Sequence, residues 1–535
     1  MVEVEKMSLS SAYAIDYFVD NLSTLAADRS RLQSLRRRSD RDLFPLFRNA
    51  LEPAYGMPSY LAAHDELVDA FGIGQNFVAK HRVLVVTGEP LLARMAGPAI
   101  RAWEIAKALA PEHDVWLVST VGVRREGEGF RASRETGTSL VAATEWADVI
   151  IFQGFLLEFA PKLHTNSKIL VADIYDPIHL EQLAQGRDLG PERRSMSVRK
   201  TTRVLNEQIA RADFMLCASD KQRDFWLGQL AGQGRVNPAV YDEDHRLASL
   251  LAVVPFGIPD EAPVQKRHAI RGAIPGIGPD DKVIIWGGGI YNWFDPLTLL
   301  RAVARLSERH DDLRLFFMGL KHPNPGVPRM RVAWQAQELA KELGLTDRVV
   351  FFNEGWVPYD ERADYLLDAD LGVSTHFHHI ETAFSFRTRI LDYLWASLPI
   401  VATEGDTFGT FIRQCGLGRT VPAKDPAALE RALEEMLYDS DAIETARASV
   451  RVFAEGYRWS AVLRPLVEFC RNPRRAVDLA NAITVPTIRT RRVKRPRYNP
   501  LTDLGNARNY LRVGGVRELV RRVCSRLKNI LGSPR

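Results

Sequence analysis

A group of acidic side chains and one histidine follows an apolar run in the first half of the chain. The segment is DIYDPIHLE, and its candidate groups are Asp173, Asp176, His179 and Glu181. Clustered carboxylates can hold a metal ion or serve as general acid and base in hydrolysis. Because all four groups lie on one short loop, we favour a role in positioning a substrate and expect no metal site.

A second group of residues has the chemistry to hold phosphate groups. AFSFRT at residues 383–388 stands where a helix should begin, and the free amides and positive dipole end of a helix bind anions. Arg387 and Arg389 would add positive charge there, or one of them faces solvent. The triple glycine at 287–289 lets the backbone approach a ligand closely, with a tight turn at a strand end as the alternative.

These groups can act together only if regular elements bring them to a common edge. RVLVVTG, from residue 82, is a short apolar run ending in glycine, which is typical of a strand buried on both faces of a parallel sheet. Further apolar runs alternate with helical segments, so we predict a doubly wound α/β domain. Its predicted strands cover residues 82–87, 114–120, 148–154, 168–176 and 212–219.

The second half repeats this architecture. The first series stops at the prolines and glycine of VVPFGIPD, and a polar stretch rich in Gly and Pro follows. A new series of predicted strands then covers residues 282–289, 313–319, 348–355, 369–375 and 399–403. We therefore predict a helical N-terminal extension at 1–80, Rossmann-like domains at 81–262 and 263–470, and a basic C-terminal extension at 471–535. Two such sheets share a ligand cleft at the carboxyl ends of their strands.

Composition indicates a folded cytoplasmic protein. Hydrophobic residues make up 46% and charged residues 26% of the chain, which excludes a disordered or disulfide-rich class. The sequence has neither a secretory signal pattern nor a run of about 20 apolar residues. The four cysteines are far apart and are expected to be reduced: Cys217, Cys415, Cys470 and Cys524.

The C-terminal extension is strongly basic. Residues 471–535 contain 17 Arg and Lys against three acidic residues, although the whole chain has a net charge of only +5. Apolar residues between 516 and 531 have helical spacing opposite an Arg and Lys face. This pattern predicts peripheral docking on an anionic membrane, with packing onto another domain as the alternative. Aromatic residues are sparse there, so we expect no binding to nucleic acid.

Three segments resemble one enzyme family. They are VVPFGIPD at 253–260, GWVPYDERADYLLDADLGVS at 355–374 and ETAFSFRTRILDYLWASLPIVAT at 381–403. Together they resemble the retaining GT-B glycosyltransferases of family four, a large bacterial group that decorates lipids and surface polysaccharides. The resemblance covers about residues 82–470. It implies an α/β fold of the GT-B type, with an acceptor domain followed by a nucleotide-sugar domain.

The same resemblance points to two acidic residues. Members of the family carry two glutamates eight positions apart, of which the first binds the sugar and the second binds the ribose. The resembling residues here are Glu381 and Asp392, which are eleven positions apart. A carboxylate can accept from both ribose hydroxyls, which suits Asp392 as the ribose ligand. The alternatives are a solvated loop position for Glu381 and an ion pair of Asp392 with Arg389.

The other implied donor contacts come from both halves. The family's basic pair after the first strand of the second half is absent, and Lys321 is the predicted substitute, with a surface lysine as the alternative. Trp356 would border the nucleobase, or belong to the core. The predicted backbone and side-chain contacts to the donor are Gly97, Gly288, Gly289, Ser385 and Arg387.

The resemblance also implies an activity. His179 or Asp176 would approach the transferred sugar together with Glu381. We expect transfer of a hexosyl-type sugar from a nucleotide diphosphate sugar to a glycan or lipid-linked acceptor, with retention and without a cofactor, in surface polysaccharide synthesis. The absent basic pair leaves an inactive GT-B-like scaffold protein as an alternative. A sugar-nucleotide epimerase on the same fold is another.

Overall fold

The computed structural model describes residues 13–14, 16–37, 58–70, 80–186, 190–324, 327, 330–480, 516 and 520. In the N-terminal part, helix α2 spans Leu22–Leu35 and helix α4 spans Pro58–Ala70. The basic C-terminal helix expected from the sequence lies outside the described residues except for 516 and 520. Of the helices within these ranges, none has both the length and the apolar character that crossing a bilayer requires.

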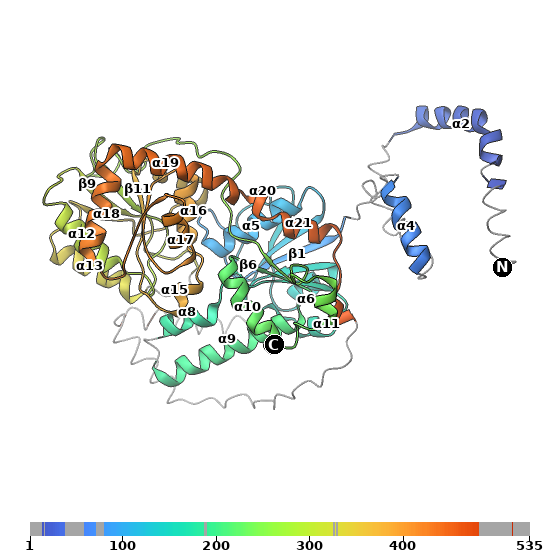
Figure 1. The fold of residues 1–535 in the computed structure, drawn as a ribbon, viewed down its shortest axis with the longest axis horizontal. Coiled ribbons are helices and arrows are strands. Elements are labelled where there is room, and N and C mark those ends of the chain that lie inside the picture. Colours follow the sequence, from blue (N-terminus) through green and yellow to red (C-terminus); the bar gives the residue numbers. More distant parts are fainter. Residues whose placement is uncertain are drawn as a thin grey trace. The chain divides into compact units, whose positions relative to one another are not determined.

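Seven parallel strands form the first sheet, in the order β3-β2-β1-β4-β5-β6-β7. Figure 1 labels two of them, β1 and β6. In the inner strand β1, Val83 lies opposite Val115 of β2 and Val149 of β4. The strand order diverges on either side of β1, which creates a crevice at the carboxyl ends of β1 and β4. The strands are β1 (Arg82–Thr87), β2 (Asp114–Ser119), β3 (Arg131–Arg134), β4 (Val149–Phe152), β5 (Ile169–Asp173), β6 (Phe214–Cys217) and β7 (Leu251–Val253).

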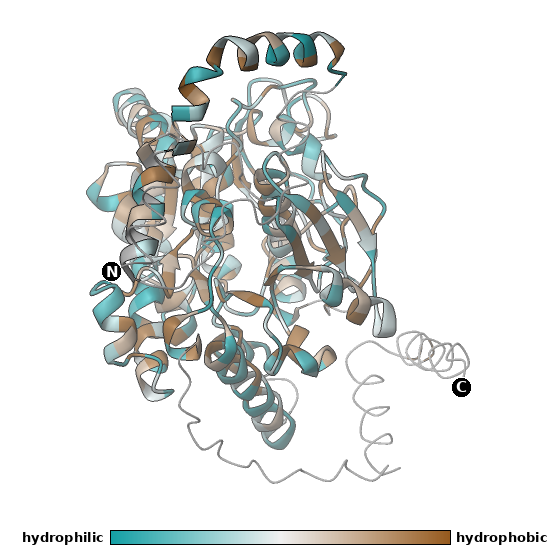
Figure 2. Ribbon diagram, turned by 90° about the vertical axis from the view of Figure 1, so that its right-hand side faces the viewer, coloured by the Kyte–Doolittle hydropathy of each residue, from teal (hydrophilic) through white to brown (hydrophobic). Residues whose placement is uncertain are grey.

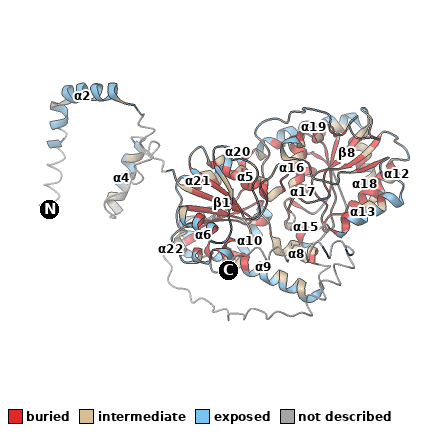
Figure 3. Ribbon diagram, turned by 180° about the vertical axis from the view of Figure 1, so that it is seen from behind, coloured by how far each residue is buried: buried red, intermediate tan, exposed pale blue. Residues whose placement is uncertain are grey.

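Helices cover both faces of this sheet, and Figure 3 shows the strands buried between them. N-terminal capping residues set where two of these helices begin. The side chains of Ser219 and Asn237 accept hydrogen bonds from backbone amides in the first turns of α10 and α11. Pro98 occupies the first turn of α5, where its missing N–H costs nothing. The main helices are α5 (Gly97–Leu109), α6 (Gly137–Trp146), α8 (Ile178–Gln185), α9 (Pro191–Arg211), α10 (Asp220–Gly232) and α11 (Pro238–Glu243).

The second sheet has six parallel strands in the order β10-β9-β8-β11-β12-β13. Hydrophobic colours concentrate in the strands, whereas the helices carry both colours (Figure 2). The strands are β8 (Lys282–Trp286), β9 (Leu313–Phe317), β10 (Val350–Phe352), β11 (Leu371–Ser374), β12 (Ile400–Thr403) and β13 (Gly418–Val421). The main helices are α12 (Pro296–Leu306), α13 (Arg331–Glu342), α15 (Ile380–Phe384), α16 (Thr388–Trp395), α17 (Thr407–Gln414), α18 (Pro426–Tyr438) and α19 (Ser440–Ala454).

The predicted α/β class with two doubly wound sheets is confirmed. Three strands lie outside the predicted strand ranges: β3 with the sequence RASR, β7 with LAV and β13 with GRTV. β7 belongs to the short apolar run just before Pro255, at which the first series of strands ends. β3 and β13 are short edge strands with polar residues, so neither shows the apolar run that marks the inner strands.

After the second sheet the chain returns to the first domain. Helices α20 (Trp459–Val462) and α21 (Arg464–Arg471) contact α5, and α22 (Val477–Ala480) contacts α11. Phe469 of α21 stacks on Phe214 of β6 with ring centroids 4.3 Å apart. The chain thus crosses between the domains twice, first near Ile258 and again near Tyr457. The two crossings hydrogen-bond to each other: Ile258 N donates to Tyr457 O, and Trp459 N donates to Ile258 O.

Candidate functional site

A cleft of about 540 Å³ lies where the carboxyl ends of the two sheets face each other. The first half contributes Thr87, the last residue of β1, with Gly88 and Glu89 after it, and the second half contributes the glycines directly after β8. The halves come close at Gly97, where an added Cβ would lie 3.7 Å from Thr388 Oγ1. The sequence-predicted cleft is therefore present.

The triple glycine after β8 forms part of the cleft wall. Gly287 donates its amide to Tyr393 Oη at 2.8 Å, and a Cβ at Gly289 would lie 3.1 Å from the Trp356 ring. Gly288 has a φ of +71° and faces open space. Packing thus accounts for Gly287 and Gly289, whereas at Gly288 the backbone conformation favours glycine and leaves room for a ligand.

The segment from α15 to α16 is fixed by a buried ion pair. Both carboxylate oxygens of Glu381 accept from the Arg387 guanidinium at 2.9 Å, and the two residues are only 2% and 5% exposed. Ser385 Oγ donates to Thr382 O at 3.1 Å. Glu381, Ser385 and Arg387 all line the cleft, just before α16 begins at Thr388.

Asp392 also lines the cleft, but its partner is Arg362 and not Arg389. Arg362 Nε donates to Asp392 Oδ1 at 3.1 Å, and the guanidinium stacks on Tyr359 and Trp395. The Asp392 side chain is 32% exposed. Burial raises the pKa of Asp392, and the positive charge of Arg362 opposes that rise. Arg362 therefore fixes the orientation of the Asp392 carboxylate, which remains partly exposed to the cleft.

Two further carboxyl groups approach Glu381 from the first domain. Asp176 and Glu181 line the same cleft and hydrogen-bond to each other. Burial, followed by the negative charge of Glu381, raises the pKa of Asp176 to about 7. Burial, followed by the charge of Asp176, raises the pKa of Glu181 well above its usual range. The pair therefore retains a proton at neutral pH and can both donate to and accept from a hydroxyl group.

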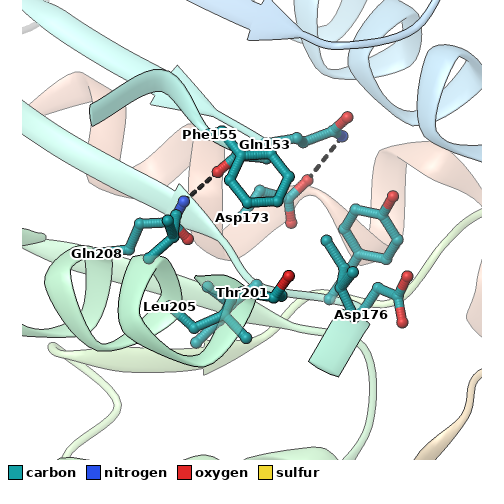
Figure 4. Close-up of a pocket in the computed structure, with 12 residues that line it drawn as sticks. Gln153, Phe155, Asp173, Asp176, Thr201, Leu205 and Gln208 are labelled. Atoms are coloured by element: carbon teal, nitrogen blue, oxygen red, sulfur yellow. Dashed lines mark hydrogen bonds between the residues drawn. The ribbon is translucent and has the colours of Figure 1, made fainter. Parts of the chain in front are cut away.

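A small pocket supports the loop that carries Asp176 (Figure 4). The side-chain amide of Gln208 donates to the Gly154 carbonyl, and Gln153 Nε2 donates to Asp173 Oδ2 at 3.0 Å. The cavity of about 30 Å³ has room for little more than a water molecule. These bonds tie the ends of β4 and β5 to α9.

The raised pKa of Asp176 predicts a pH-dependent stability. The folded protein holds a proton that the unfolded chain releases near pH 4, so this stabilisation is complete below pH 4 and is lost as pH rises through about 7. Asp176→Asn is expected to reduce the fall in melting temperature between pH 5 and pH 8 by several degrees. Thermal unfolding across that range, with exposed Asp242→Asn on α11 as the control, tests this; parallel curves for Asp176→Asn and the wild type would contradict it.

Trp356, predicted to border the nucleobase, and Lys321, predicted to supply the missing positive charge, differ in their placement. Trp356 lines the cleft, its Nε1 donates to Met95 O at 3.1 Å, and its carbonyl accepts from Arg94 Nε at 2.6 Å. Lys321 is exposed and does not line the cleft. Its neighbour His322 does, with its ring 5.4 Å from that of Trp356.

His179 lies beside the cleft but does not line it. Its ring packs against Phe225 and Trp226 of α10, with centroids 5.6 and 6.0 Å away. Burial lowers the pKa of His179, and its Nδ1 has no hydrogen-bond partner among the described residues. Of the two residues predicted to approach the sugar from this loop, the structure brings Asp176 to Glu381 and leaves His179 against α10.

Sequence reasoning missed Glu89. It lines the cleft two residues after the end of β1, and Asn324 of the other domain donates to its carboxylate at 3.0 Å. Burial raises the pKa of Glu89 to about 7. Its position after a strand end in a parallel sheet is the signal that would have identified it.

Metal coordination has no evident site in the described ranges. Among those residues, no group of three or more His, Cys, Asp or Glu side chains is arranged to hold a metal ion.

Two Rossmann-like sheets facing a common cleft define the GT-B fold. Residues 281–439, which include the second sheet, match the family model of the group 1 glycosyl transferases.

Solved structures share the fold at low sequence identity. A sucrose-phosphate synthase from Thermosynechococcus elongatus is 15% identical with a TM-score of 0.54, covering 73% of this chain and 98% of its own. Anabaena HepE in complex with UDP and glucose is 12% identical with a TM-score of 0.52, covering 72% and 98%. WaaG, a glycosyltransferase involved in lipopolysaccharide biosynthesis, is 16% identical with a TM-score of 0.50, covering 72% and 99%. No curated protein sequence matches the chain.

Proposed function

We propose that the protein transfers a sugar from a nucleotide diphosphate donor to a glycan or lipid-linked acceptor. The observation that carries this proposal is the convergence of a glycine loop, a helix N-terminus and a cleft-facing carboxylate on one wall of a group 1 glycosyl transferase domain. These three features suit a diphosphate and a ribose. The complex of HepE with UDP and glucose gives an example of such ligands on the same fold.

In the proposed arrangement, the donor lies along the second domain. Asp392, held by Arg362, accepts hydrogen bonds from the ribose hydroxyls. Gly288 and the N-terminus of α16 face the diphosphate, and Trp356 borders the base. The transferred sugar then lies towards Asp176, Glu181 and Glu381, which bind its hydroxyl groups.

We further propose transfer of a hexosyl-type sugar with retention. The bond between the anomeric carbon and the diphosphate oxygen breaks, and the acceptor oxygen bonds to that carbon on the same face. The acceptor proton passes to the leaving diphosphate. Because charge develops on the leaving group, stabilisation of that charge by the cleft contributes most of the catalysis.

We propose surface polysaccharide or glycolipid synthesis in the cytoplasm as the setting. The support is the basic C-terminal segment, whose 17 Arg and Lys among residues 471–535 suit peripheral contact with an anionic leaflet where lipid-linked acceptors lie.

Thermal unfolding with a panel of UDP, GDP, dTDP and ADP sugars tests the donor proposal. A ligand at 100 times its dissociation constant adds about 2.7 kcal/mol to the free energy of unfolding, so one base class should raise the melting temperature clearly. Asp392→Asn removes the negative charge and one of the two acceptor oxygens proposed to bind the ribose, and is expected to reduce that shift by at least half.

Asp148→Asn is the matched control, since Asp148 is a carboxylate paired with Arg82 outside the cleft. No shift with any sugar nucleotide would favour a non-catalytic scaffold. Consumption of the donor without an acceptor, yielding an isomer, would favour an epimerase.

A further inference from the structure

Three arginines line the same cleft, and two of them are already occupied. Arg387 forms a two-bond ion pair with Glu381, and its Nε lies 3.8 Å from Asp406. Arg362 holds Asp392. Their positive charges are balanced by partners in the protein, so neither supplies a net charge to a bound anion.

Arg389 differs from both. Its Nη2 donates to the Gly289 carbonyl at 2.8 Å, and its Nη1 has no hydrogen-bond partner among the described residues. The guanidinium lies over the rings of Trp286 and Phe294, at 4.3 and 3.9 Å. The residue is only 7% exposed, so this charge lies just under the cleft surface without a carboxylate of its own.

Burial lowers the pKa of Arg389 to about 10, so the side chain remains charged at neutral pH. A buried guanidinium with an unused donor costs free energy, and that cost is relieved when an anion arrives. Arg389 therefore gains more from a bound anion than either paired arginine does.

The position of Arg389 indicates which anion this is. It is the second residue of α16, and a Cβ at Gly287 would lie 3.3 Å from Arg389 Cβ. Gly288, whose open side faces the cleft, is the next residue along this loop. A free helix N-terminus, a glycine loop and an unbalanced cation thus meet at one point, which suits the negative charge of a diphosphate.

We propose that Arg389 is the cation that balances the donor diphosphate and replaces the basic pair missing after β8. This inference rests on the proposed function and sharpens it. Arg387 then serves to hold Glu381, and Lys321, exposed and outside the cleft lining, has no part in the site.

Inorganic pyrophosphate is the probe, because it carries the diphosphate without requiring a known base or sugar. Its affinity is measured by calorimetry on the full chain for wild type, Arg389→Gln, Arg389→Lys and Arg387→Gln. The expected result is a loss of at least about tenfold for Arg389→Gln, with Arg389→Lys intermediate, because a charge-assisted hydrogen bond is lost or weakened. Exposed Arg301→Gln on α12 changes the net charge equally and should bind as wild type does.

Other outcomes separate this inference from the proposed function. If Arg389→Gln, shown to be folded by circular dichroism, keeps wild-type affinity, or if only Arg387→Gln loses it, the assignment of Arg389 is wrong while the enzyme proposal stands. Should Arg389→Gln fail to fold, the conservative Arg389→Lys decides: unchanged affinity would overturn the assignment. If wild type binds neither pyrophosphate nor any sugar nucleotide, the proposed function itself fails.

Discussion

Replacing Arg101 with methionine is expected to lower the free energy of unfolding by about 3–5 kcal/mol, because it leaves the Asp173 carboxylate charged and buried. Arg101 Nε and Nη2 donate to both Asp173 oxygens at 2.7 and 2.8 Å, and neither side chain is exposed. The same guanidinium donates to the carbonyls of Val254 and Pro255, at the first crossing between domains. Thermal unfolding should show a fall in melting temperature on the order of 10 °C.

Arg471→Met is the matched control. Arg471 also makes a two-bond pair with a carboxylate, Glu112, at 2.7 and 2.6 Å, but its side chain is 52% exposed. An exposed pair contributes about 0–1 kcal/mol because water solvates both charges when the pair is broken. Equal effects of the two substitutions would show that burial of the Arg101 pair does not determine its contribution.

Replacing Glu381 with glutamine is expected to reduce kcat/KM at least about a hundredfold, because it removes a charge from the centre of the cleft. Arg387 loses its balancing carboxylate, which also lowers stability. Without the negative charge of Glu381, the pKa of Asp176 should fall from about 7 towards its ordinary range. Steady-state kinetics as a function of pH, with the donor found by thermal shift, measures both effects.

The double variant Glu381→Gln with Arg387→Met separates stability from activity. Removing both partners avoids an uncompensated buried charge, so stability should recover relative to Glu381→Gln alone. Activity should not recover, because the cleft still lacks the Glu381 carboxylate. Recovery of both would mean that Glu381 acts only as a structural partner of Arg387.

Much of the fold could be predicted from sequence because buried parallel strands are continuous apolar runs. RVLVVT and KVIIW illustrate this, since every residue after the first is buried in each strand. Strand β13 could not be recognised in this way. It begins at Gly418 with a φ of +150°, and a Cβ there would lie 1.9 Å from Ile400 O, a constraint that only the neighbouring strand imposes.

The site was predictable in its location but not in its pairings. Glu381, Ser385, Arg387 and Asp392 line the cleft as the sequence indicated. Helical spacing offered an ion pair of Asp392 with Arg389, three residues away, as the alternative to ribose binding. The actual partner is Arg362, thirty residues earlier in the sequence, and Arg389 instead bonds to Gly289. Such choices depend on contacts between distant segments, which local spacing does not contain.

The paired crossings near Ile258 and Trp459 limit how the cleft can open. Because the two connecting segments are hydrogen-bonded to each other, they form a double-stranded hinge. Such a hinge favours rotation of the domains about a single axis and resists twisting or sliding. An added Cβ at Gly257 would lie 2.6 Å from Trp459 Cδ2, so even an alanine side chain would clash with Trp459 at this hinge. Because the chain returns to the first domain after the second sheet, the first domain is built from two separate parts of the sequence. A fragment that ends at residue 455 would lack Phe469 and would leave the apolar surface around Phe214 uncovered.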